Sequence, residues 1–201
     1  LSLPAANFHA VPATLDDETA VLVEPTAAAC EILTQVDIGP RATVAVVGDG
    51  RMALIVGQVL RTTGANVTIF GKHDRKLLVA RHIGLDARRS TDDTPASSFD
   101  VSVDVTGRPA GLTRALELVR PRGTVVMKST FHGETPITLW PAIVDEVTLV
   151  GSRCGPFADA IALLARDQVH TGPLLAGTYP LEEFEAAFAA TRSELKVLLR
   201  P

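Results

Sequence analysis

The sequence predicts an α/β fold: a doubly wound, parallel sheet of about six strands with helices on both faces. Short runs of apolar and β-branched residues alternate with segments whose apolar residues recur at helical spacing. The first such strand runs into a glycine-rich turn that opens directly into a helix. The composition is 46% hydrophobic but only 4% aromatic, and this mix suits helices packed on a parallel sheet.

The stretch from Thr43 to Thr68 combines a strand, a tight glycine turn, a helix and the start of a second strand. Gly48 permits the sharp exit from the strand, and Gly50 lets a pyrophosphate approach the backbone because it has no side chain. The first N–H groups of the helix would hold that anion, and the small Ala53 allows the helix to pack on the strand. The pattern predicts a Rossmann dinucleotide-binding unit; the alternative is an ordinary βαβ turn without a ligand. The candidate cofactor residues of this turn are Gly48, Asp49, Gly50, Arg51 and Met52.

The remaining elements follow in chain order. Pro25 suits the first turn of a helix. Helices are predicted over residues 26–35, 77–83, 110–118, 157–164 and 181–191, and further strands over 85–87, 101–105, 124–127, 147–150, 174–179 and 195–199. Residues 1–20 show no core of their own, and the pattern changes character after residue 151. We therefore expect three parts: 1–20 as the tail of another domain, 21–151 as the dinucleotide-binding domain, and 152–201 as a returning segment.

Charge and cysteine content narrow the classes of protein. The 201 residues carry a net charge of −4, which is too mild to indicate a nucleic-acid surface. The two cysteines, Cys30 and Cys154, form no CxxC pair, so we expect a reducing, cytoplasmic location. Cys154 is expected to be buried or at an interface. No apolar run reaches the ~18 residues of a membrane span, so no membrane partner is expected.

The exit of the second strand bears on the choice of nucleotide. An NAD-preferring enzyme places an acidic residue about 20 residues past the glycine turn, where it binds the ribose hydroxyls. Gly71 holds that position, and Lys72 and His73 follow with positive charge. This favours NADP, with NAD as the alternative, because charge-assisted hydrogen bonds to a phosphate are strong. The alternative interpretation of the basic residues is a solvated helix start.

Two further strand exits should face the same crevice. Thr106 and Gly107 are expected near the ribose on the nicotinamide side, and Lys128 and Ser129 near the nicotinamide or the substrate. Plain strand-to-helix turns are the alternative for both. His132 is the histidine that could reach a substrate.

The motifs LPAANFHAVP, VEPTAAACEIL, VVGDGRMA, IFGKH, DVTG, YPLEEFEAAFAA and LKVLLRP occur in this order. In them the chain resembles the zinc-containing alcohol dehydrogenase branch of the medium-chain dehydrogenase/reductase superfamily, over essentially its whole length. The resemblance implies that an N-terminal GroES-like catalytic domain precedes residue 1 and is missing from this chain. Residues 1–20 match the last segment of that domain, and residues after about 152 match the return to it.

The resemblance also implies the chemistry: an NADP-preferring, zinc-assisted hydride transfer on a small alcohol or carbonyl substrate. Zinc needs about three protein ligands, and only Glu24 remains at a position that supplies a metal ligand or a partner of metal-bound water in the family. A carboxylate favoured by a helix N-terminus is the alternative for Glu24. Zinc is expected only with the missing domain, and this chain alone is expected to be inactive. A non-catalytic NADP(H)-binding module or a truncated pseudo-enzyme is the alternative function. The family also implies a homodimer joined through the sheet edge at 147–150.

Overall fold

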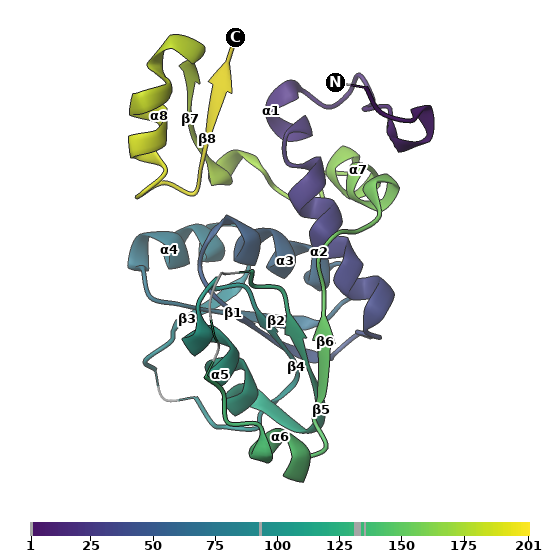
Figure 1. The fold of residues 1–201 in the computed structure, drawn as a ribbon, viewed down its shortest axis with the longest axis vertical. Helices are drawn as coiled ribbons and strands as arrows, with labels where there is room; N and C mark the ends of the chain where they lie inside the picture. The colour runs from purple at the N-terminus through teal and green to yellow at the C-terminus, as the bar shows by residue number, and fades with distance from the viewer. Residues whose placement is uncertain (1, 93, 131–133, 135) are drawn as a thin grey trace.

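The computed structural model describes residues 2–92, 94–130, 134 and 136–201. Its main body is a six-stranded sheet in the order β3-β2-β1-β4-β5-β6, in which all neighbours run parallel (Figure 1). The strands are β1 (Thr43–Val47), β2 (Asn66–Gly71), β3 (Asp86–Arg89), β4 (Phe99–Asp104), β5 (Val119–Met127) and β6 (Thr148–Gly151). The direction of strand order reverses between β1 and β4, and this switch point is where ligands bind in such sheets.

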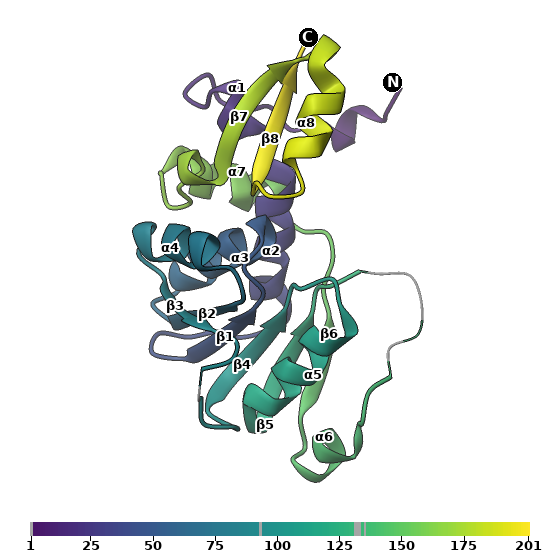
Figure 2. The same ribbon diagram turned by 90° about the vertical axis from the view of Figure 1, so that its left-hand side faces the viewer.

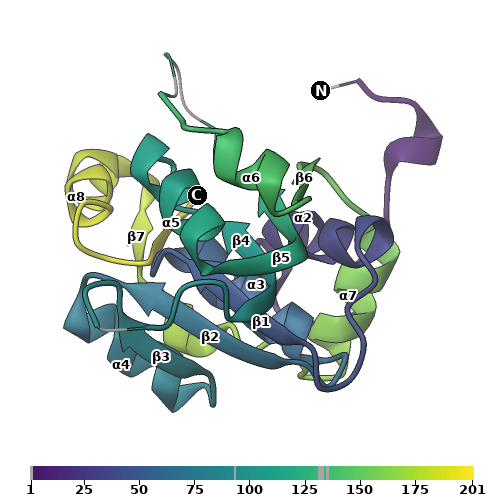
Figure 3. The same cartoon turned by 90° about the horizontal axis from the view of Figure 1, so that it is seen from below.

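Helices cover both faces of the sheet, as the sequence predicts. One layer holds α2 (Val23–Gln35), α3 (Arg51–Arg61) and α4 (Asp74–His82), and the opposite side holds α5 (Pro109–Leu118) and α6 (Trp140–Val144) (Figures 1 and 3). α7 (Phe157–Ala165) packs against α2. The larger apolar core lies under α2, α3 and α4, and a smaller one lies between α5 and the sheet.

The last part of the chain builds a separate small sheet of two parallel strands, β7 (Leu175–Pro180) and β8 (Lys196–Arg200). α8 (Phe184–Ala190) lies beside it, after the 3-10 turns η2 (Gly172–Leu174) and η3 (Leu181–Glu183). Near the other end of the chain lie η1 (Ala5–Asn7) and α1 (Asp17–Ala20), and α1 lies next to β7 and β8 (Figure 2). Glu18 of α1 accepts a hydrogen bond from Thr178 Oγ1 at 3.2 Å and pairs with Arg200 at 3.6 Å.

Besides shifts of a few residues at their ends, the elements differ from the sequence predictions in several places, and the short helix α1 and the turn η1 are not predicted. β5 begins at Val119 rather than Thr124, because the segment around Arg122, at φ 61°, is accommodated as an irregularity in its register with β4. The short helix α6 is not predicted by the sequence. α8 is shorter than expected, and Phe184 and Phe188 are 49% and 66% exposed, so its apolar stripe is not buried within this chain.

In the part of the chain that the structure describes, no helix combines the length and apolarity needed to cross a bilayer.

Candidate dinucleotide-binding site

A cavity of about 510 Å³ opens at the carboxyl ends of β1, β2 and β4, at the switch point of the sheet. It is bounded by the turn between β1 and α3, the turn between β2 and α4, the residues after β3, and the start of α5. Seven of the residues predicted from the sequence line it: Gly48, Asp49, Gly50, Gly71, Lys72, His73 and Thr106. Arg51, Met52, Gly107, Lys128 and Ser129 are not among the described residues of its lining.

The glycines of the first turn have the geometry that the sequence predicts. Gly48 has a φ of 131°, and a Cβ on it would lie 3.1 Å from Val105 Cγ2, so both its backbone and its surroundings favour glycine. A Cβ on Gly50 would meet no heavy atom within 4 Å. The space above Gly50 is therefore open to a ligand, next to the first N–H groups of α3, which have no partner inside the helix. Ala53, fully buried, packs the helix on the sheet.

Asp49 joins this turn to the next one. Its Oδ2 accepts hydrogen bonds from the backbone N–H groups of Lys72 at 2.6 Å and His73 at 2.8 Å. The imidazole Nδ1 of His73 lies 2.9 Å from Oδ2 and 3.1 Å from Oδ1. Burial opposes ionisation of Asp49, but these hydrogen bonds and the charge of His73 outweigh it and lower the pKa of the carboxyl. Asp49 is therefore a buried anion that fixes the start of α4.

The position of Asp49 corrects one inference from the sequence. Gly71 itself carries no carboxylate, but a Cβ on Gly71 would lie 2.5 Å from Asp49 Cβ and 2.7 Å from Asp49 Oδ2. The expectation that this place holds no carboxylate is thus wrong. The acidic group comes from the glycine turn itself. Counting about 20 residues past that turn along the sequence therefore does not find it.

The rest of the cavity wall is basic and hydroxylic. Lys72 and Lys76 approach it from the α4 side, and Arg108 and Arg114 from the α5 side. Ser90 and Thr91 line it after β3, and Ser90 is held there by hydrogen bonds from its N–H and Oγ to the Gly71 carbonyl, at 2.7 and 3.1 Å. The end of the cavity that is lined by Lys72, Lys76, Ser90 and Thr91 suits an anionic group.

The two later strand exits are bonded to one another. The N–H and Oγ1 of Thr106 donate to Asp104 Oδ1 at 3.0 and 2.8 Å, and Ser129 Oγ accepts from the N–H of Gly107 at 2.8 Å. Lys128 Nζ donates to Ser152 Oγ at 3.2 Å and to the Arg153 carbonyl at 3.1 Å. Burial lowers the pKa of Lys128, and the nearby carboxylates of Glu31 and Glu24 partly offset this.

One cationic residue near the site is not apparent from the sequence. Lys196, at the start of β8, is partly buried, and burial together with the positive charge of Arg51 lowers the pKa of its ammonium. Arg51 Nη1 also donates to the Leu195 carbonyl at 3.5 Å. The side chains of Lys196 and Arg51 therefore lie near each other beside the start of α3. They lie far apart in the sequence, so only the folded chain reveals them.

The zinc prediction needs ligands from outside this chain and stays a prediction. Glu24 is exposed in the first turn of α2, and the described residues contain no group of three or more His, Cys, Asp or Glu side chains that could hold a metal ion. Glu24 alone does not fit zinc, which needs about three protein ligands. His132 lies outside the described residues. Cys154 is exposed rather than buried within this chain, and its expected place at an interface stays a prediction.

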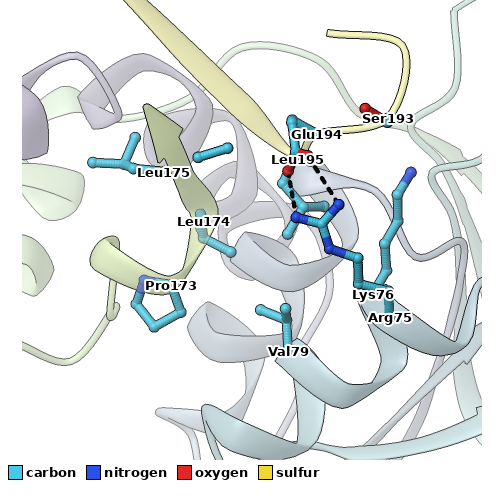
Figure 4. Close-up of a pocket in the computed structure, with 10 residues that line it drawn as sticks. Arg75, Lys76, Val79, Pro173, Leu174, Leu175, Ser193, Glu194 and Leu195 are labelled. Atoms are coloured by element: carbon cyan, nitrogen blue, oxygen red, sulfur yellow. Dashed lines mark hydrogen bonds and ion pairs between the residues drawn. The ribbon is translucent and has the colours of Figure 1, made fainter. Parts of the chain in front are cut away.

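A second, smaller cavity of about 90 Å³ lies between α4 and the C-terminal segment (Figure 4). Arg75 of α4 crosses it and donates to both carboxylate oxygens of Glu194, at 2.9 and 2.8 Å. Apolar side chains, among them Val79, Leu174 and Leu195, line the rest. This cavity is too small for a nucleotide and marks the join between the large sheet and the small one.

The sheet order, the open glycine turn and the cavity at the switch point define the class of protein: a dinucleotide-binding α/β domain of Rossmann type. A family model described as zinc-binding dehydrogenase matches residues 52–166, and the chain belongs to that family. This confirms the resemblance inferred from the sequence.

Several relatives match nearly all of this chain. Sorbitol dehydrogenase of Halalkalibacterium halodurans is 28% identical over 97% of the chain and 62% of its own length. D-arabinitol dehydrogenase 1 of Uromyces fabae is 28% identical over 93% of the chain and 59% of its own length. The chain thus spans less than two thirds of these relatives and corresponds to their nucleotide-binding part.

Solved structures show the same fold. L-idonate 5-dehydrogenase from Escherichia coli has a TM-score of 0.86 and 26% identity, covering 94% of this chain and 58% of its own. An Escherichia coli CFT073 alcohol dehydrogenase complexed with NADH has a TM-score of 0.89 at 21% identity, covering 99% of this chain and 64% of its own. The relatives are dehydrogenases of polyols, alcohols and sugar acids, and the predicted Rossmann fold is confirmed.

Proposed function

We propose that this chain binds NAD(P)(H) and serves as the hydride-carrier part of an oxidoreductase acting on a small polyol or alcohol. The observation that carries the proposal is the cavity at the sheet's switch point, whose floor is the open turn at Gly50. A bound nicotinamide supplies the hydride acceptor or donor. The chain's own part is to hold the pyrophosphate on the N–H groups of α3, with Arg51 and Lys196 supplying positive charge beside them.

Substitution of Gly50 tests the binding site directly. Gly50→Ala adds a methyl group in open space, so the fold should be unaffected, but the methyl would occupy the path of the pyrophosphate. We expect the dissociation constant for NADPH, measured by calorimetric titration of the chain, to rise about tenfold or more. Gly39→Ala is the matched control, since a Cβ there also meets nothing within 4 Å. If both variants weakened NADPH binding equally, the proposed binding site at Gly50 would be wrong.

NADP is the proposed preferred cofactor, with NAD as the alternative. The preference is supported by Lys72 and Lys76 and by the hydroxyls of Ser90 and Thr91, which line one end of the cavity. Lys72→Ala should weaken NADPH binding about tenfold while leaving NADH nearly unchanged, because only NADPH carries the 2′-phosphate. Arg122→Ala, which removes an exposed cation paired with Glu146 outside the cavity, is the control. Tighter binding of NADH than NADPH by the unaltered chain would exclude the preference.

We propose that residues 21–151 form the nucleotide domain. Residues 1–20 and 152–201 would pack on a catalytic domain. Support comes from exposed apolar side chains at both places, including Phe8, Val11, Phe184 and Phe188. Glu24 and the predicted zinc would belong to the same contact region, with the other ligands supplied by that domain.

The second candidate is a binding module without chemistry. Zinc content and polyol oxidation by the longest natural polypeptide that contains this chain distinguish the two. NADPH binding with no zinc and no turnover of any polyol would favour the module.

A homodimer through β6 is also proposed. In the described sheet β6 pairs with β5 on one side only, and Leu149 on this edge strand is 36% exposed. Next to it in the chain, α6 exposes Trp140, Ile143 and Val144. An exposed apolar strand edge of this kind is usually covered by another element or another chain.

A further inference from the structure

We propose that Asp49 and His73 form the subsite for the 2′ position of the cofactor's adenosine ribose, with Asp49 as the residue that sets nucleotide specificity. The inference rests on the proposed dinucleotide binding. It differs from the usual arrangement, in which the acidic residue stands at the end of the second strand. Here that place is Gly71, and the carboxylate is delivered from the glycine turn.

The space around Gly71 shows why the acid comes from elsewhere. Any side chain on Gly71 would collide with Asp49 Cβ at 2.5 Å and with Leu77 Cδ2 at 2.8 Å. Asp49 Oδ2, 2.7 Å from the place of that missing Cβ, already occupies the volume of a residue-71 side chain. Glycine at 71 and aspartate at 49 are thus complementary, and the carboxylate takes the place that a side chain at position 71 would fill.

The two carboxylate oxygens are used unequally. Oδ2 accepts from both backbone N–H groups and is 2.9 Å from His73 Nδ1, whereas Oδ1 makes a longer contact of 3.1 Å to the same nitrogen. A carboxylate has about four lone-pair sites, so Oδ1 can still accept a hydrogen bond from a ribose hydroxyl. Asp49 and His73 both line the cavity, so a ligand there can reach the pair.

Charge then decides between a hydroxyl and a phosphate at the 2′ position. The ionised Asp49 attracts a 2′-hydroxyl and repels a 2′-phosphate, whereas Lys72 and Lys76 attract the phosphate. Arg108 and Arg114 are the other charged groups in the described lining, from the α5 side. His73 contacts both carboxylate oxygens of Asp49 and so holds the carboxylate in place at this end of the cavity.

The test compares NADPH and NADH dissociation constants for the chain and two variants. Asp49→Asn keeps the shape and an acceptor for the two N–H groups but removes the charge. We expect it to shift the affinity ratio towards NADPH by about tenfold. His73→Asn keeps a donor near the position of Nδ1 and leaves the charge of Asp49 in place, so the ratio should change by less than about threefold.

His73 is 62% exposed in its side chain, so His73→Asn should fold even if Asp49→Asn does not. Equal weakening of both nucleotides by Asp49→Asn, or a shift of the ratio by His73→Asn as large as the shift expected for Asp49→Asn, would overturn the inference. Failure of the unaltered chain to bind either nucleotide would instead overturn the proposed function on which it rests.

Discussion

At the residue scale, the carboxylates of two aspartates hold turns of this chain in place. Asp49 ties the glycine turn to the start of α4 through two backbone N–H groups. Asp100 has the corresponding part at the opposite end of the sheet, where its Oδ2 accepts from the N–H and Oγ1 of Thr43 at 2.7 and 2.8 Å. Arg120 Nε donates to its Oδ1 at 2.7 Å. Both aspartates act on residues that are distant in the sequence.

Asp100→Asn is expected to reduce the free energy of unfolding at neutral pH by about 1 kcal/mol, a figure discounted because the side chain is 34% exposed. The hydrogen bond from Thr43 and the contact with Arg120 lower the pKa of Asp100 to about 2. Its contribution is therefore complete above the unfolded pKa of about 3.9 and is lost as the pH falls towards 2.

Urea unfolding at about pH 7 and about pH 3 measures this difference. The gap between the unaltered chain and Asp100→Asn should narrow at the lower pH. Asp37→Asn, a change at an exposed carboxylate, is the control and should leave stability within about 0.5 kcal/mol. A gap that stays constant with pH would show that the ionised form of Asp100 is not the stabilising one.

At the scale of elements, the small β7–β8 sheet is joined to the nucleotide domain through α4. The two-point contact between Arg75 and Glu194 bridges the cavity shown in Figure 4. Gln58 of α3 makes a second link, since its Oε1 accepts from the N–H of His170 at 2.7 Å. These links place Lys196 beside Arg51, at the start of the pyrophosphate-binding helix.

Removing the contact between Arg75 and Glu194 should make β8 open more readily. We expect Arg75→Ala to speed amide hydrogen exchange in residues 194–200 while leaving β1 and β4 unchanged, because only the C-terminal segment loses a partner. Arg75→Lys keeps one charge but cannot bond both oxygens, so its exchange should be intermediate. Unchanged exchange in Arg75→Ala would mean that the apolar lining alone holds the segment.

At the scale of the whole molecule, most of the exposed large apolar residues lie in three places. These are the residues before α1, the segment around α8, and α6 with β6. Surfaces of this kind are typical of contacts with other domains or chains. In Figure 1 the N-terminal segment and α8 lie towards the top and α6 lies at the bottom, so different partners can cover them.

The proposed dimer predicts a selective effect of charge at the sheet edge. Leu149→Glu should convert a dimer into a monomer, because a carboxylate at the open edge of β6 resists burial. Leu78→Glu is the matched control, since Leu78 is 60% exposed on α4 and away from this edge. Light scattering coupled to size-exclusion chromatography measures the mass. A monomer for the unaltered chain would exclude the dimer.

The fold followed closely from local sequence, because strand and helix periodicities and the glycine turn are short-range signals. Six of the predicted strands form the large sheet and two the small one, with ends displaced by a few residues. α6 escaped prediction because it is a single short turn of helix, too brief for a periodic pattern. Phe184 and Phe188 are spaced to lie on one face of α8, but the sequence does not show whether this face is exposed, since burial depends on what else covers the helix.

The candidate site also has one part that the sequence predicts and another part that only the tertiary structure shows. The sequence alone identified the glycine turn and the exits of β2 and β4, because each is a contiguous motif whose backbone geometry is local. The tertiary structure decided which side chains meet: the Asp49 carboxylate over Gly71, and Lys196 beside Arg51. Electrostatic and steric contacts act through space over a few ångströms. Residues that folding brings together from distant positions therefore leave no pattern in the order of the amino acids.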